Sequence, residues 1–96
     1  MRHHAGIADV QGEGCAVLAT LSFRNAEHKK VISNSGGIDA IVAAMRTHRD
    51  TGGVQVDACK ALASLAFDAA LQVEIAEKGG VEAIVSAMKR HQWWSD

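Results

Sequence analysis

The sequence predicts an all-α protein built from copies of one helical unit that stack against each other. Three observations support this prediction: the chain repeats itself, apolar residues recur at helical spacing within the repeat, and glycine pairs stand where helices must reverse. No segment alternates apolar and polar residues as a half-buried strand would, and proline is absent. Because 96 residues make at most one domain, we expect a single module spanning residues 1–96.

The repetition is visible when the chain is aligned with itself. Residues 1–23 overlie residues 45–67 at an offset of 44, with ten identities in 23 positions. Residues 32–48 overlie residues 75–91 at an offset of 43, with nine identities in 17 positions. Unrelated segments would share roughly one residue in twenty, so the alignment indicates a duplicated unit of about 44 residues.

Each unit is expected to contain three helices. Residues 10–23 carry one apolar stripe, and residues 26–33 supply a shorter helix. Apolar residues then fall at i, i+3, i+4 and i+7 starting from Ile38, which is the spacing of one helix face. The pattern recurs in the second copy, in residues 54–67, 70–77 and 80–91.

Glycine marks the expected reversals between these helices. The pairs at 36–37 and 79–80 separate each short helix from the next, because glycine accepts the left-handed backbone that a sharp reversal needs. Thr-Gly-Gly at 51–53 marks the other break, and the first copy diverges from it at residues 5–9, where we also expect a loop. Three short helices cannot bury their apolar faces alone, so neighbouring units must stack.

The repeat resembles those of the armadillo family. The resemblance rests on Val-Gln-x-x-small-Cys-x-x-Leu-x-x-Leu-x at 10–22 and 54–66, and on Gly-Gly-(Ile/Val)-x-Ala-Ile-Val-x-Ala-Met at 36–45 and 79–88. It implies a right-handed α-solenoid of armadillo-type three-helix repeats. HEAT-like repeats, which usually have two helices, are the alternative.

On this resemblance the chain holds one complete repeat and two incomplete ones. Residues 1–23 are the end of one repeat, with its third helix at about 10–23. Residues 24–67 are a complete repeat, and residues 68–96 are a partial repeat with a tryptophan-rich tail.

In the armadillo family the third helices line a concave groove that binds proteins or peptides. Members that bind extended peptides often carry an asparagine at the position of Thr20 and Ser64, and a tryptophan at that of Ala16 and Lys60. Neither family residue is present, so recognition of basic peptides is not expected. The resemblance places these residues on the concave face: Glu13, Ala16, Thr20, Arg24, Asp57, Lys60, Ser64 and Asp68. They form either a mixed-charge surface that selects a partner or an ordinary solvated helix face.

The cysteines and histidines are expected to be structural. Cys15 and Cys59 lie one repeat apart among small apolar residues, which is typical of buried thiols and too distant for a disulfide. His4, His48 and His91 each follow a basic residue at a helix end, where positive charge suits the helix dipole and repels a metal. We expect no metal site and no cofactor.

Trp93 and Trp94 interrupt the repeat pattern near the carboxyl end. Two large aromatic side chains in a polar segment seldom stay fully in water. Three interpretations remain open: a cap folded over the end of the stack, an anchor into another chain, or a remnant of cloning.

The composition excludes several classes of function. The formal net charge of −1 gives no reason to expect binding to nucleic acid or membrane, and neither a secretory signal nor a catalytic motif is present. We therefore expect an intracellular, cytoplasmic protein-protein interaction scaffold that is not an enzyme. The alternative is a structural module that self-associates end to end as a dimer or oligomer, cut from a longer repeat array, because its end helices expose apolar stripes.

Overall fold

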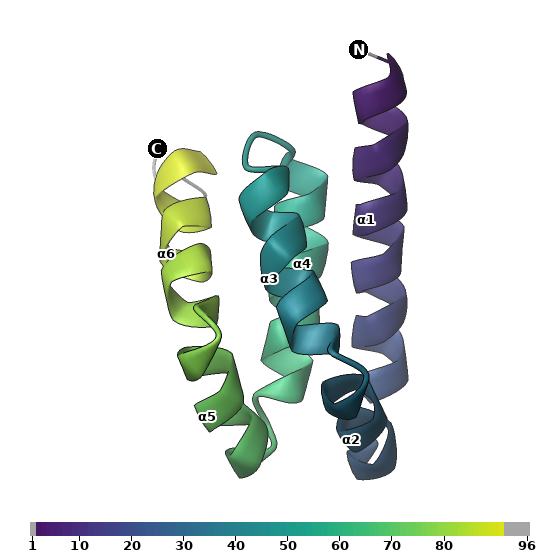
Figure 1. The fold of residues 1–96 in the computed structure, drawn as a ribbon, viewed down its shortest axis with the longest axis vertical. Coiled ribbons are helices and arrows are strands. Elements are labelled where there is room, and N and C mark those ends of the chain that lie inside the picture. Colours follow the sequence, from purple (N-terminus) through teal and green to yellow (C-terminus); the bar gives the residue numbers. More distant parts are fainter. Residues whose placement is uncertain (1, 92–96) are drawn as a thin grey trace.

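The computed structural model describes the backbone of residues 2–91 and the side chains of residues 8–91, and the regular elements in that range are helices joined by short turns. In chain order the helices are α1 (Arg2–Ser22), α2 (Ala26–Asn34), α3 (Gly37–Thr47), α4 (Gly52–Leu65), α5 (Ala69–Glu77) and α6 (Gly80–His91) (Figure 1). No strand occurs among the described residues, and the predicted all-α class is confirmed.

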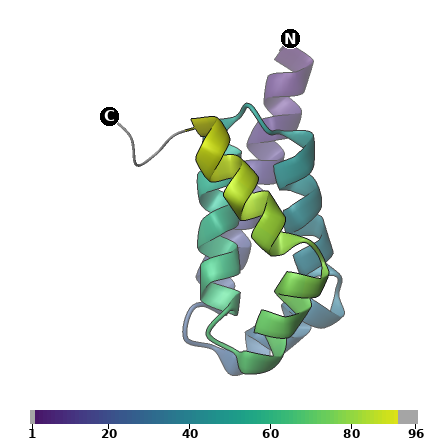
Figure 2. The same cartoon turned by 90° about the vertical axis from the view of Figure 1, so that its left-hand side faces the viewer.

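Helices related by the sequence repeat lie side by side. The long helices α1 and α4 run in the same direction and pack against each other, and α3 packs against α6 on the other side of α4 (Figures 1 and 2). The short helices α2 and α5 lie at the same end of the molecule (Figure 1). Each unit therefore places its long helices directly on their counterparts in the next unit.

The two short helices begin at equivalent capping residues. The Asn25 side chain accepts a hydrogen bond from the backbone N–H of His28, at 2.9 Å. The Asp68 carboxylate accepts from the backbone N–H groups of Ala70 and Leu71. These bonds satisfy amide groups that a helix start leaves without a partner, and they fix where α2 and α5 begin.

Both Gly-Gly reversals form as expected, and the two glycines of a pair act differently. The first of each pair, Gly36 or Gly79, adopts a left-handed backbone with φ of 81° or 87°. The second allows a close helix approach: a Cβ on Gly37 would lie 2.7 Å from the Ile32 carbonyl oxygen. A side chain at either position would strain the turn.

The loop expected at residues 5–9 is absent, because α1 continues unbroken from Arg2 to Ser22. The physical reason lies in the break of the second copy. There Thr51 is extended, with φ −98° and ψ 98°, and two glycines follow it. Residues 5–9 have one glycine and no proline, so nothing in them stops a helix.

The core is a layer of aliphatic side chains centred on α3 and α4. Its largest fully buried members include Ile38, Ile41, Leu62 and Leu65. In the part of the chain that the structure describes, no helix is both long and apolar enough to cross a membrane.

Candidate functional site

The predicted concave face corresponds to the exposed side of the α1–α4 pair. Glu13 and Thr20 on α1 and Lys60 on α4 are exposed, whereas Ala16 and Asp57 are half-buried. Because α1 and α4 are parallel and adjacent, these five residues belong to two neighbouring helix faces (Figure 1). This α1–α4 face is the candidate site.

A shallow hollow of about 320 Å³ opens on this face between the two helices. Three of the predicted residues line it, namely Thr20, Lys60 and Ser64. Two further lining residues, Ala19 and Phe23, were missed by the sequence analysis. They make the hollow largely apolar, with the Lys60 ammonium as its charged group.

Ser64 lines the hollow but is mostly buried, so it contributes more to the packing of α1 on α4 than to a surface that a partner could contact. Its Oγ is 2.7 Å from the Oγ of Ser22, which is itself fully buried. Ser22 Oγ also lies 3.2 Å from the Ala19 carbonyl oxygen. One arrangement satisfies both distances: Ser64 donates to Ser22, and Ser22 donates to the carbonyl. This hydrogen bond fixes α1 against α4.

The Thr20 hydroxyl is also partly engaged. Its Oγ1 donates to the Ala16 carbonyl oxygen one turn earlier, at 3.0 Å. The hydroxyl can still accept a hydrogen bond from a partner, since this contact uses only its proton.

Two predicted residues are not on the helical face, and their placement there was wrong. Arg24 follows the end of α1 with a left-handed backbone, φ 56°, so the helical spacing that placed it on the face stops short of it. Asp68 lies beyond the end of α4, and its carboxylate caps α5. Both residues sit in the turns that leave the long helices.

Aromatic residues at the two helix ends form a feature that the sequence analysis did not use. Phe23 and Phe67, which are identical in the repeat alignment, are both exposed. The Arg24 guanidinium lies 5.1 Å from the Phe23 ring centroid, and the Lys29 ammonium lies 5.6 Å from that of Phe67. Their identity in both copies was the signal that could have drawn attention to them. Since α1 and α4 end at the same end of the molecule, cations and aromatic rings gather there (Figure 1).

Both thiols are free, and neither is placed for reactivity. Cys15 is buried and Cys59 is half-buried. Burial raises the pKa of both thiols, and the nearby Asp57 carboxylate raises that of Cys15 further. A raised pKa keeps a thiol protonated and poorly nucleophilic.

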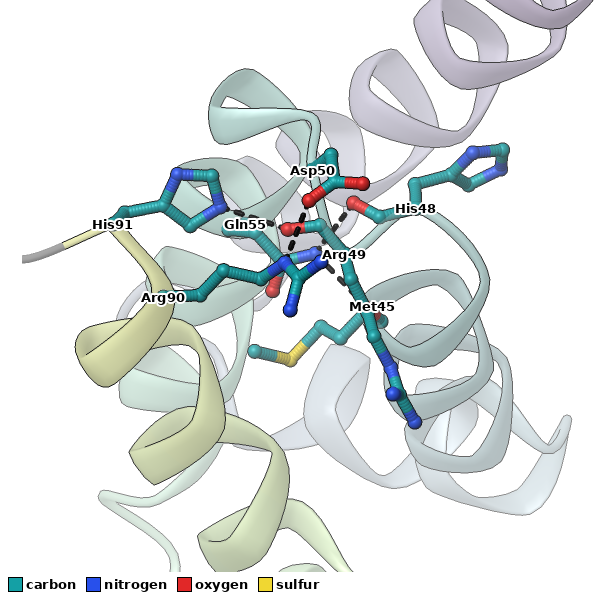
Figure 3. Close-up of polar contacts among 7 residues, drawn as sticks. All are labelled: Met45, His48, Arg49, Asp50, Gln55, Arg90 and His91. Atoms are coloured by element: carbon teal, nitrogen blue, oxygen red, sulfur yellow. Dashed lines mark hydrogen bonds and ion pairs between the residues drawn. The ribbon is translucent and has the colours of Figure 1, made fainter.

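A polar cluster joins the α3–α4 loop to the end of α6 (Figure 3). Arg90 Nε donates to the Asp50 carboxylate at 2.6 Å, and this hydrogen bond, with the charge of Arg90, lowers the pKa of Asp50. The His91 ring nitrogen Nε2 lies 2.8 Å from the Arg49 carbonyl oxygen, which can only accept, so the ring donates. His91, which was expected only to place positive charge at a helix end, therefore also links the last unit to the complete one.

The amide of Gln55 forms the inner part of the same cluster. This side chain is buried, and its Nε2 donates to the carbonyl oxygens of Met45 at 3.0 Å and His48 at 2.9 Å (Figure 3). The Met45 carbonyl lies in the last turn of α3, where a helix leaves acceptors without an intrahelical donor, and His48 is the residue that follows the helix. Gln55 thereby ties the end of α3 to the start of α4.

The described residues contain no candidate metal site, and the tryptophan pair is not among them. Among the described residues, no three His, Cys, Asp or Glu side chains are grouped closely enough to hold a metal ion. The His4 side chain lies outside the described residues, as do Trp93 and Trp94.

Comparison with known proteins finds a relative that matches part of this chain. It is 43% identical over 60 residues to Protein aardvark of Dictyostelium discoideum. The match covers 59% of this chain and 8% of that protein, so the chain spans a small part of its relative's length. No family model and no solved structure matches.

Proposed function

We propose that the chain is an armadillo-type module that binds a protein or peptide along the α1–α4 face. In this proposal α2, α3 and α4 form one complete repeat of a right-handed solenoid. The packing of α1 on α4 and of α3 on α6 supports it, because stacked repeats place equivalent helices side by side. The complete unit, α2 to α4, contains three helices, which favours this architecture over a HEAT-like one.

The hollow between α1 and α4 is the observation that carries the binding proposal. It offers apolar surface from Ala19 and Phe23 beside the exposed ammonium of Lys60. A partner segment that fits is an apolar side chain next to a carboxylate, the first entering the hollow and the second pairing with Lys60. Exposed Phe23 adds the kind of aromatic contact that often dominates binding energy.

Selection from a random peptide display library tests this proposal. Peptides selected on the wild-type chain are expected to contain an apolar residue beside an acidic one. The variant Lys60→Glu should weaken their binding about tenfold or more, because it puts like charges at the contact. Thr20→Trp should weaken it comparably by filling the hollow.

The matched control is Lys30→Glu, which reverses an exposed lysine on α2 outside the hollow. It should leave the dissociation constants within about twofold of the wild type. If no peptide is selected, or if the selected peptides bind both hollow variants as tightly as the wild type, the proposal is wrong.

A further inference from the structure

Three apolar residues of α6 are exposed although their counterparts in α3 are buried. Val81, Val85 and Met88 are 40–52% exposed. Their counterparts at the 43-residue offset are at most 2% exposed: Ile38, Val42 and Met45. Identical or nearly identical side chains therefore differ only in what covers them.

The outer side of α1 shows the same contrast with α4. Val10, Val17 and Leu21 are 47–67% exposed. Their counterparts at the 44-residue offset are at most 2% exposed: Val54, Ala61 and Leu65. Each end of the molecule thus exposes an apolar stripe, and the equivalent stripe on α3 or α4 is buried inside the molecule.

The contacts between helices identify what each stripe lacks. The helix α3 packs against both α1 and α4, and its counterpart α6 packs against α4, the counterpart of α1. No helix in the described part of the chain packs on α6 as α4 packs on α3. The element that fits the uncovered stripe of α6 is therefore a helix like α4, and α1 is the helix that resembles α4 in sequence.

We propose that two copies of this chain associate head to tail, with α1 of one copy docked on α6 of the other as α4 docks on α3. In this arrangement α5 and α6 of one copy and α1 of the next complete a three-helix unit. The apolar stripes of α6 and α1 cover each other. The α1–α4 faces of successive copies line up, and the association does not depend on whether they bind a partner.

Polar residues at the two ends support the same pairing. Gln11, the counterpart of Gln55, is exposed, and docking would bring its amide to the backbone of Met88, the counterpart of Met45. Asp9 of α1 is exposed and is the counterpart of Gly53 in the first turn of α4, and Lys89 in the last turn of α6 is also exposed. Because α4 starts at the end of the molecule where α3 finishes (Figure 1), the same docking would bring these opposite charges near each other.

A head-to-tail contact joins two different surfaces, and this gives a sharp test. Val17→Asp puts a charge on the α1 stripe, and Val85→Asp puts a charge on the α6 stripe. Because both valine side chains are exposed in the single copy, each variant should fold. By sedimentation velocity, the wild type should gain mass from low micromolar to millimolar concentration and exceed a dimer, since such contacts do not close. Each variant alone should associate at least about tenfold more weakly.

Mixing the two variants gives the decisive test. The intact α6 stripe of Val17→Asp can accept the intact α1 stripe of Val85→Asp, so an equimolar mixture should form a heterodimer that grows no further. Val73→Asp is the matched control, because this exposed valine of α5 has an exposed counterpart, Lys30. It should associate as the wild type does. A monomeric wild type at millimolar concentration, a single variant that associates as tightly as the wild type, or a mixture that fails to pair would overturn the proposal.

Discussion

Replacing Met45 by alanine should lower the free energy of unfolding by about 2–5 kcal/mol, the range for removing a buried methionine side chain. Met45 belongs to the core, where α3 meets α4, and its loss leaves a cavity. The variant should show a lower urea midpoint, followed by circular dichroism at the helical band. For a domain of this size, such a loss is a large part of the total stability.

The repeat supplies its own control for this prediction. Met88 occupies the equivalent position in α6 but is 40% exposed, so Met88→Ala should change the free energy of unfolding by less than about 1 kcal/mol. Both should be measured at low micromolar concentration, where head-to-tail association is weak. Equal losses in the two variants would mean that α3 is not covered by α4 as described.

Replacing Gln55 by alanine should cost about 1–3 kcal/mol, because it leaves a buried carbonyl without a donor. The Met45 carbonyl loses its hydrogen bond in a buried setting, and the His48 carbonyl loses one in a partly buried setting. Urea unfolding measures the loss. The last turn of α3 should also fray, visible as faster amide hydrogen exchange there.

Gln11→Ala is the matched control, since this glutamine is identical in the repeat and exposed. It should leave the free energy of unfolding of the single copy nearly unchanged. At high concentration it should weaken the head-to-tail association. A Gln55→Ala variant as stable as Gln11→Ala would contradict the role given to the Gln55 amide.

The helices and their reversals could be predicted from the sequence because local signals decide them. The spacing of apolar residues predicted the buried faces of the helices, and the glycine pairs predicted the turns before α3 and α6. The break at residues 5–9 was predicted by analogy between the copies and failed. The analogy ignored that the second copy breaks at a Gly-Gly sequence that the first copy lacks.

The candidate site was predicted less well, because helix ends and side-chain partners are not periodic. Extending the helical spacing to Arg24 and Asp68 ran past the ends of α1 and α4. Asn25 and Asp68, at equivalent positions, are residue types that favour helix N-caps, and this signal could have corrected the placement. The burial of Ser64 depends on Ser22, 42 residues away, and no spacing rule reveals that contact.

The candidate site and the packing of the repeats both depend on the register in which α1 lies against α4, and an engineered disulfide tests this register most directly. Ser22→Cys and Ser64→Cys place two thiols where the hydroxyls now touch, in a background with Cys15→Ala and Cys59→Ala. Under mild oxidation at low micromolar concentration, mass spectrometry of the tryptic fragments should show a bond within one chain, in a protein that keeps its helical spectrum. A helical protein that forms this bond only between chains, or not at all, would contradict the packing of α1 on α4.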